Sequence, residues 1–316
     1  MNVKRFAVAK YIIKRLVGLV VLLFLVSSCV FIMLHYAPGD PALLLLGAET
    51  TPAKVQELRS NLGLNDPLYL QYWKFIKNLV LRGDLGRSYQ SGRPVTQEIL
   101  STLPISAQLA LNGMIISSLV AIIVGVLSAV RQNSLLDNVT KIVVLAGVSM
   151  PVFWLGLVFI AIFSVWLRFF PSAGWGGVRY MILPSITIAA FPLATLTRLT
   201  RSTMLEVIRK PYIRTARSKG LSEGAVIIRH ALRNALIPVV TMMGVQFAIL
   251  VTGSILTETV FAIPGLGRLI VIAVYARDYA IIRGAILVCA VVFGIVNLLV
   301  DLSYHLFDPR LKFGES

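Results

Sequence analysis

Long runs without a charged side chain alternate along the chain with shorter polar segments. The uncharged runs cover residues 16–39, 99–130, 142–167, 180–197, 234–257 and 284–300. A helix that crosses a bilayer needs about 20 mostly apolar residues, within a range of about 17–25. The pattern therefore predicts an all-α integral membrane protein with six spanning helices. We place these spans at residues 11–34, 103–130, 139–167, 180–199, 235–262 and 281–306.

The longest polar segment lies between the first two spans. Pro38, Gly39 and Pro41 are typical of a helix end. The stretch 51–80 favours two short helices separated by a break at "GLNDP" (63–67). We interpret this segment as a cap on the membrane surface with interfacial aromatic residues. A docking surface for an external partner and an unstructured linker are the alternatives.

Two spans carry residues that are unusual in a lipid-facing helix. Pro151 is expected to kink the third span. The fourth span contains two prolines and several hydroxyl side chains, which favours contact with other helices or with a water-filled path. Helix packing is the alternative role for these hydroxyls. The candidate pore-lining residues are Ser149, Ser185, Thr187 and Thr195.

The charge distribution indicates the orientation. Only 14% of residues are charged and 57% are hydrophobic, whereas charged residues make up about a quarter of a soluble domain. The net charge of +16 would suit nucleic-acid binding if it were spread over a soluble surface, but Lys and Arg are concentrated in alternate segments. Those segments are 1–15, 131–141, 198–233 and 307–316. By the positive-inside rule both termini are cytoplasmic, and we expect no nucleic-acid partner.

The first span could in principle be a cleaved signal peptide. Its apolar run is too long for one, and no small-x-small cleavage site follows it, so we interpret it as a retained span.

Chemistry-bearing residues are sparse. His35, His230 and His305 are far apart in sequence, and no metal-binding motif or G-x-x-x-x-G-K-[ST] phosphate loop occurs. The chain is therefore not expected to hydrolyse ATP or to bind a cofactor or metal. Cys29 and Cys289 fall inside spans, where cysteine usually acts as a small hydrophobe.

Few acidic residues lie within the spans. We identify Glu258, near the outer end of the fifth, and Asp301, in the sixth. An ionisable residue inside a membrane suggests a function by default. Asp301 is close enough to the inner end of its span for a structural role.

The stretch "YIRTARSKGLSEGAVIIRHALRNALIP" (212–238) is strongly basic and lies between two apolar spans. Leu221, Ala225, Ile228 and Leu232 recur at helical spacing, so one helix face is apolar. Gly220 marks the junction of two short helices. A solvated basic loop explains the charges alone, whereas a partner-docking element also explains the helices and the apolar face.

Several motifs resemble one membrane-protein family. They are "PGDP" (38–41), "GDLGRSY" (83–89), "SMPVFW" (149–154), "RTARSKG" (214–220), "FAIPGLGR" (261–268) and "DPRLK" (308–312). Together they resemble the permease subunits of ABC importers of the dipeptide, oligopeptide and nickel group. The general "EAA…G" signature is matched only at Ala216 and Gly220, and Arg233 replaces its later proline. Both departures fit the peptide subgroup.

The resemblance implies a type I importer fold, in which a five-helix core follows the N-terminal span. The implied divisions are 1–102, the N-terminal span and extracytoplasmic loop; 103–306, the transport core; 198–234, a cytoplasmic coupling loop; and 307–316, a cytoplasmic tail. The implied residues that contact the ATPase are Arg214, Thr215, Ala216, Arg217, Gly220 and Leu221. Gly220 is expected to need a positive φ or a close approach to that ATPase.

The resemblance also implies the partners. These are a second, paralogous permease, two cytoplasmic ATPases that bind ATP and Mg²⁺, and an extracytoplasmic substrate-binding protein, in lipid at the bacterial cytoplasmic (inner) membrane. We expect a non-catalytic permease subunit for di- or oligopeptides. Nickel or nickel-chelate uptake is the alternative within the family, and a stand-alone secondary transporter is the alternative outside it. A membrane hydrolase lacks a credible nucleophile and base.

Overall fold

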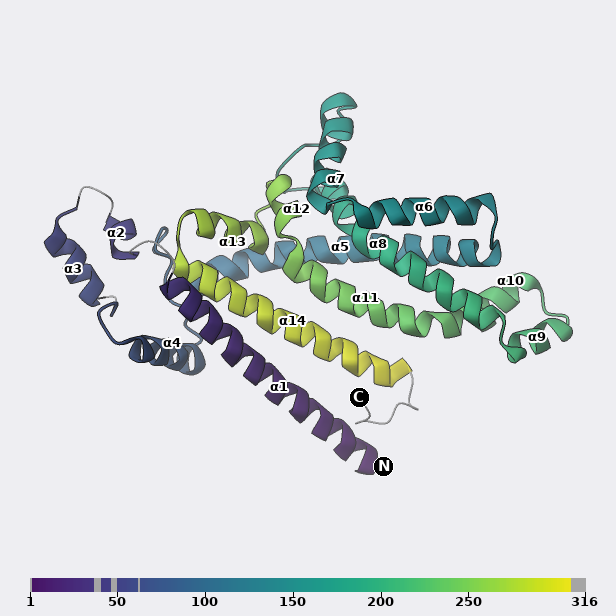
Figure 1. The fold of residues 1–316 in the computed structure, drawn as a ribbon, viewed down its shortest axis with the longest axis horizontal. Coiled ribbons are helices and arrows are strands. Elements are labelled where there is room, and N and C mark those ends of the chain that lie inside the picture. Colours follow the sequence, from purple (N-terminus) through teal and green to yellow (C-terminus); the bar gives the residue numbers. More distant parts are fainter. Residues whose placement is uncertain (1, 37–40, 47–49, 62, 308–316) are drawn as a thin grey trace. The chain divides into compact units, whose positions relative to one another are not determined.

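The computed structural model describes residues 2–36, 41–46, 50–61 and 63–307. This part of the chain is helical and contains no strand, which confirms the all-α prediction. The helices (Figure 1) are α1 (Asn2–His35), α2 (Pro41–Leu46), α3 (Pro52–Asn61), α4 (Leu68–Arg82), α5 (Val95–Val130), α6 (Leu135–Ser149), α7 (Val152–Phe159), the π-helix η1 (Ile160–Trp166), α8 (Val178–Ile208), α9 (Pro211–Ser218), α10 (Glu223–Ala225), the π-helix η2 (Val226–Leu232), α11 (Arg233–Gly253), α12 (Ile255–Val260), α13 (Leu266–Tyr275) and α14 (Tyr279–Phe307).

Five helical runs are long and apolar enough to cross a membrane, and a sixth is obtained if one bent pair counts as a span. The bent pair is α6 with α7 and η1, which meet at 104°. The single helix with a kink predicted for this span is therefore wrong: the helix is interrupted. Pro151 has no N–H to continue the ladder, and Met150 before it is extended, at φ −87° and ψ 131°.

The fifth predicted span also differs from the structure. Its helix begins earlier, at Glu223, and ends at Gly253. Ser254 then separates it from the short helix α12. Helix α13, which begins at Leu266 within the motif at 261–268, is apolar but at ten residues too short to span.

The described chain divides into two compact units. The first contains residues 2–106 and 264–294. Its core joins the end of the predicted extracytoplasmic segment to the start of α5, to α13 and to the first half of α14. The buried members are Phe75, Leu85, Val95, Ile99, Leu266, Ala273, Ala280, Ile281, Ile282, Ala285 and Leu287.

Within this unit, α1 packs against α4 and α14 (Figure 1). The hydroxyl groups of Ser27 and Ser28 lie 2.9 and 2.8 Å from the phenol oxygen of Tyr72. Gly294 of α14 leaves room for the side chain of Leu19, which an added Cβ would overlap. Small residues at a helix contact permit this close approach.

Two short helices, α3 and α4, occupy the stretch 51–80, as predicted. The turn between them is closed by Gln71, whose amide donates to the carbonyl oxygens of Leu64 and Asp66 at 3.2 and 2.9 Å. The helix stop predicted at Pro38–Pro41 includes residues 38–40, which lie outside the described residues, as does the tail after Phe307.

The second unit contains residues 107–263 and 295–307 of the described chain. Helix α8 is its centre and packs against α6, α7 and α11. Glycines of α5 also approach α8 closely: a Cβ at Gly125 would lie 2.7 Å from the Cβ of Thr200. Close packing accounts for the polar sequence of α8, because most of its hydroxyl groups bond to its own backbone or are buried.

Candidate functional site

The basic segment begins where α8 ends. Arg209 and Lys210 separate α8 from Pro211, the first residue of α9. Proline suits this position because the missing N–H would have no helical partner there. Helix α9 buries one face in a small apolar cluster of the second unit. The cluster contains Ala129, Met204, Ile213, Ala216, Val226, Ala231 and Ala235.

The predicted coupling residues lie together around the end of α9. Ala216 is buried and anchors α9 to the cluster. The others are exposed: Arg214, Thr215, Arg217, Gly220 and Leu221. The segment therefore has one face fixed to the membrane helices and one face free for contact.

Gly220 forms the joint that follows α9. Its φ is +76°, in the left-handed region that favours glycine. A Cβ built at this position would meet no atom within 4 Å, so the backbone conformation, and not packing, favours glycine here. The expectation of a positive φ is confirmed.

An ion pair closes the joint. The guanidinium group of Arg217 donates to both carboxylate oxygens of Glu223, from Nη2 at 2.6 Å and from Nε at 3.1 Å. These hydrogen bonds raise the pKa of Arg217 above its ordinary value. Both side chains are exposed, so water screens the pair, which acts mainly on the geometry of the turn. We call residues 217–223 the Gly220 turn.

The second of the two predicted short helices is not separate. From Glu223 the chain continues through α10 and η2 into α11 as one helical run to Gly253. The Gly220 turn is therefore directly followed by a helix that is long and apolar enough to cross a membrane. Sequence periodicity did not show this because Pro238 lies inside α11 and resembles a boundary.

The apolar face predicted on this helix is divided in the structure. Leu232 packs against the buried cluster. Leu221 and Ile228 point outward and are 43% and 68% exposed. The π-helical turns of η2 rotate side chains away from the 3.6-residue period, so that Val226, Ala231 and Ala235 take the buried positions.

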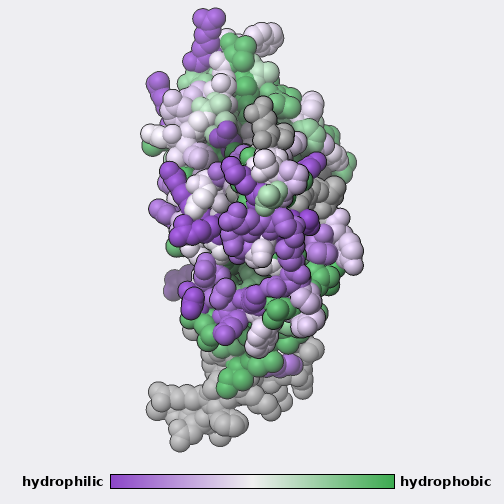
Figure 2. Space-filling view, turned by 90° about the vertical axis from the view of Figure 1, so that its left-hand side faces the viewer, coloured by the Kyte–Doolittle hydropathy of each residue, from purple (hydrophilic) through white to green (hydrophobic). Residues whose placement is uncertain are grey.

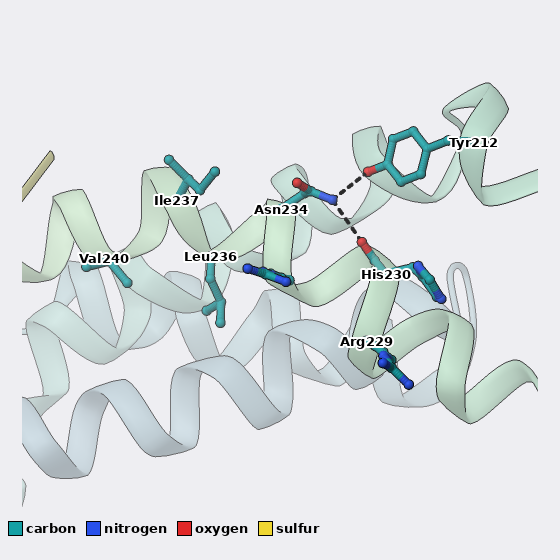
Figure 3. A pocket seen from close by; sticks show the side chains of 8 residues that line it. Tyr212, Arg229, His230, Asn234, Leu236, Ile237 and Val240 are labelled. Atoms are coloured by element: carbon teal, nitrogen blue, oxygen red, sulfur yellow. Dashed lines mark hydrogen bonds between the residues drawn. The ribbon is translucent and has the colours of Figure 1, made fainter. Parts of the chain in front are cut away.

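A pocket of about 710 Å³ lies between Tyr212, at the start of α9, and the η2–α11 helix (Figure 3). Its lining residues are Tyr212, Arg229, His230, Arg233, Asn234, Leu236, Ile237 and Val240. The amide of Asn234 donates to the phenol oxygen of Tyr212 at 3.1 Å and to the carbonyl oxygen of His230 at 3.0 Å. The bond to Tyr212 holds α9 against the longer helix.

The pocket is basic and contains no acidic lining residue. No ion pair joins Arg229 or Arg233 to a carboxylate within the described residues. Two exposed guanidinium groups beside apolar walls suit an acidic protein surface with an apolar neighbour.

The four predicted pore-lining residues separate into two pairs. Ser149 and Thr195 are accessible at the surface of the second unit, where each donates to the carbonyl four residues earlier. Ser185 and Thr187 are buried. The Thr187 hydroxyl donates to the carbonyl of Leu183 at 2.8 Å.

A buried ion pair was missed by the sequence analysis. Asp137, in the first turn of α6, is fully buried and accepts from Nε and Nη2 of Arg201 at 2.6 and 2.9 Å. Ser128 donates to the same carboxylate at 2.5 Å, and Lys141 lies 2.9 Å from it. The pair joins α5, α6 and α8. Its only sequence signal is the capping pattern Ser134-x-x-Asp137.

The sequence analysis identified two acidic residues within the spans, Glu258 and Asp301. Glu258 is fully buried and accepts from the hydroxyl of Ser254 at 2.5 Å. The side chain of Asp301 is outside those that the structure describes. Within the described residues, no three His, Cys, Asp or Glu side chains are placed to hold a metal ion.

Comparison with known proteins accounts for nearly the whole chain. The family described as "Binding-protein-dependent transport system inner membrane component" matches residues 121–313, and its N-terminal companion matches residues 8–110. The glutathione transport system permease protein GsiC of Escherichia coli (strain K12) is 43% identical over 303 residues, 96% of this chain and 99% of GsiC. GsiC of Shigella boydii serotype 4 (strain Sb227) is 42% identical over the same length and coverage.

Two solved structures share the fold. Inward-facing conformations of the methionine ABC transporter MetNI match 67% of this chain and 97% of the matched chain, with a TM-score of 0.55 and 19% identity. An amino acid ABC transporter with histidines matches 68% of this chain and 95% of the matched chain, with a TM-score of 0.51 and 15% identity. At these identities the likeness concerns the fold alone.

Proposed function

This chain belongs to the family of binding-protein-dependent transport system inner membrane components, and from that membership we propose that it forms half of the translocation path for short peptides. It is the permease subunit of an ABC importer and crosses the membrane several times. The proposal concerns its cargo, its partners and the way it couples to ATP hydrolysis.

The Gly220 turn is the observation that supports coupling. It is exposed, its left-handed backbone favours glycine, and its far side continues into the helix that ends at Gly253. We propose that a cytoplasmic ATPase docks on Arg214, Thr215, Arg217 and Leu221, with Ile228 as an apolar contact. A rigid docked element can transmit domain closure to the spans, as in hinge-like switching.

The basic pocket extends this docking surface. An acidic side chain of the ATPase would pair with Arg229 or Arg233, while Ile237 and Val240 provide the apolar wall. ATP and Mg²⁺ would then be bound by the ATPase subunits and not by this chain. A second permease, paralogous to this one, would complete the path, and an extracytoplasmic binding protein would deliver the cargo.

We propose that Ser149 and Thr195, which are accessible in this chain, line the translocation path. Ser185 and Thr187 are buried, which supports this role less for them. Cysteines at the first two positions should react with water-soluble thiol reagents at rates that depend on nucleotide state. Equal rates in all nucleotide states would contradict the assignment.

The proposed cargo is a di- or oligopeptide, and the relatives named for glutathione transport support a small peptide-like molecule. The test is to purify the chain with its operon partners and to measure ATPase stimulation by the binding protein. Dipeptides, longer peptides, glutathione and nickel chelates would be loaded in turn. Stimulation by nickel chelates alone would overturn the peptide proposal.

Coupling is tested by Gly220→Val. A β-branched residue at a φ of +76° is strained by about 1–3 kcal/mol, so the turn should change shape while the spans insert normally. We expect uptake to be abolished at normal membrane abundance. Transport, abundance and co-purification of the ATPase are the measurements.

Two matched variants make the result specific. Gly224→Val changes a glycine in the same segment that has open space and no positive φ, and it should retain most uptake. Gly220→Asn should retain more uptake than Gly220→Val, because asparagine tolerates the left-handed region. Wild-type uptake by Gly220→Val would show that the turn is only a solvated loop.

A further inference from the structure

A second polar pocket lies in the first unit, within the predicted extracytoplasmic segment and the start of α14. Its volume is about 430 Å³, within the range of about 300–1,000 Å³ that is usual for small-molecule sites. Its polar lining comes from α3, the turn between α3 and α4, α4 itself, the connecting segment 83–94 and α14. The residues of interest are Lys74, Asn78, Asp84, Tyr89 and Arg283. Figure 2 views the molecule from the end where α3 and α4 lie, and hydrophilic residues gather across the middle of this face.

Arg283 is the unusual member of this lining. Its guanidinium carbon stands 3.8 Å from the centre of the Phe75 ring. Its Nε is buried and has no hydrogen-bond partner. The stacking compensates for part of the lost hydration, but a buried cation normally has an anionic partner as well.

The neighbouring carboxylates of this unit do not supply that partner. Asp66 pairs with Lys74 at 2.5 Å. Asp278 accepts from the Ser88 hydroxyl at 2.5 Å and from the backbone N–H of Ile281 at 3.2 Å, which holds it at the start of α14. Asp84 accepts from the N–H of Gly86 through Oδ1 at 2.8 Å. Within the described residues, Arg283 therefore has no protein carboxylate.

The rest of the lining indicates the kind of ligand. The Asp66–Lys74 pair is neutral, which leaves one cation, Arg283, and one exposed carboxylate, Asp84. Burial raises the pKa of the Tyr89 phenol, although the charge of Arg283 opposes this, so the phenol stays protonated and can donate a hydrogen bond. A multiply charged anion would be repelled by Asp84, whereas a molecule with one carboxylate and one ammonium group matches both charges.

We propose that this pocket binds a small zwitterion, an amino acid or short peptide, with its carboxylate on Arg283 and its ammonium group toward Asp84. The planar guanidinium fork matches a carboxylate in a way that lysine does not. The inference deepens the proposed function. It rests on that function for the choice of peptides as the ligand class, because peptides are also the proposed cargo. It gives the permease its own ligand site, apart from the binding protein.

The test is calorimetric titration of the full chain in lipid nanodiscs, without partner subunits. The probes are alanyl-alanine, its C-terminal amide and its N-acetyl derivative. We expect alanyl-alanine to bind the wild type, and both blocked forms to bind at least about tenfold more weakly, since each loses a charged contact. Absence of binding to the wild type, or equal binding of the amide, would overturn the proposal.

Variants assign the effect to the pocket. Arg283→Gln should weaken alanyl-alanine at least about tenfold, and Arg283→Lys should give an intermediate loss. Arg82→Gln changes an exposed arginine of α4 outside the lining and should bind as the wild type does. Circular dichroism and size exclusion check that each variant is folded. Should Arg283→Gln misfold, equal binding by the wild type and a folded Arg283→Lys would still overturn the proposal.

The outcome is separable from that of the proposed function. The titration needs neither ATPase nor binding protein. If binding depends on Arg283 but the system imports no peptide, the ligand site is supported and the cargo assignment is wrong. If the system imports peptides but Arg283→Gln binds alanyl-alanine as the wild type does, the cargo assignment is supported and the ligand site is wrong. If Arg283→Gln weakens only capture of the binding protein, the pocket is a protein contact and the proposal fails.

Discussion

At the scale of single residues, the carboxylate of Asp137 is a buried charge of the second unit that several polar groups surround. It receives hydrogen bonds from Arg201 and Ser128 and pairs with Lys141, so three helices meet at one charge. Breaking a buried pair by removing one partner is strongly destabilising, because the other charge is left without compensation. Removing one partner of the exposed pair of Arg217 and Glu223 should cost little stability, since water screens this pair.

Asp137→Asn should therefore lower the free energy of unfolding by about 3–5 kcal/mol, because it leaves the Arg201 guanidinium without an anion. The measurement is the thermal midpoint and the membrane abundance of the detergent-solubilised variant. A double variant, Asp137→Asn with Arg201→Met, should recover part of the loss.

Glu206→Gln is the control for this prediction. It removes the exposed partner of Lys210, 2.8 Å away, and should shift the midpoint little. Equal effects of the two substitutions would show that burial of Asp137 does not determine its contribution.

At the scale of helices, contact between α5 and α8 depends on the absence of side chains. Gly125 lies so close to α8 that a Cβ would come within 2.7 Å of the Thr200 Cβ and 3.0 Å of the Thr197 carbonyl oxygen. Backbone cannot move aside as a flexible side chain can. Gly147 of α6 also faces α8, but its nearest neighbour, the Ala194 Cβ, is at 3.8 Å.

Gly125→Ala should consequently destabilise the protein by about 1–3 kcal/mol, the usual cost of overpacking. Gly147→Ala adds the same methyl group where it fits and should be neutral or slightly stabilising, because alanine is the better helix former. Thermal unfolding of the two purified variants is the comparison. Tolerance of both substitutions would show that α5 and α8 can separate without cost.

At the scale of the whole molecule, orientation in the membrane decides which surface meets the ATPase. The proposed topology places both termini and the Gly220 turn in the cytoplasm and α3 and α4 outside. It rests on the distribution of Lys and Arg in the short connecting segments.

Cysteine labelling tests this topology in a variant without Cys29 and Cys289. Lys77→Cys, on the exposed side of α4, should react with a membrane-impermeant reagent in intact cells. Ser222→Cys should react only after permeabilisation. Labelling of position 222 from outside would remove the coupling proposal as well.

Hydrophobic runs by themselves determined the class of protein, the approximate spans and the two helices of the long polar segment. These follow from the length of a bilayer crossing and from local turn chemistry, which act within a few neighbouring residues. The preference for glycine at position 220 was also local, because it concerns a single backbone dihedral.

Only the tertiary structure decided which polar residues meet. Arg201 is 64 residues from Asp137, and Arg283 stacks on Phe75 from another helix; no periodicity relates such positions. It also decided that the third span is broken and that the helix after Gly220 continues into the fifth span. Periodicity reports which face of a helix is apolar, whereas these features depend on what that face packs against.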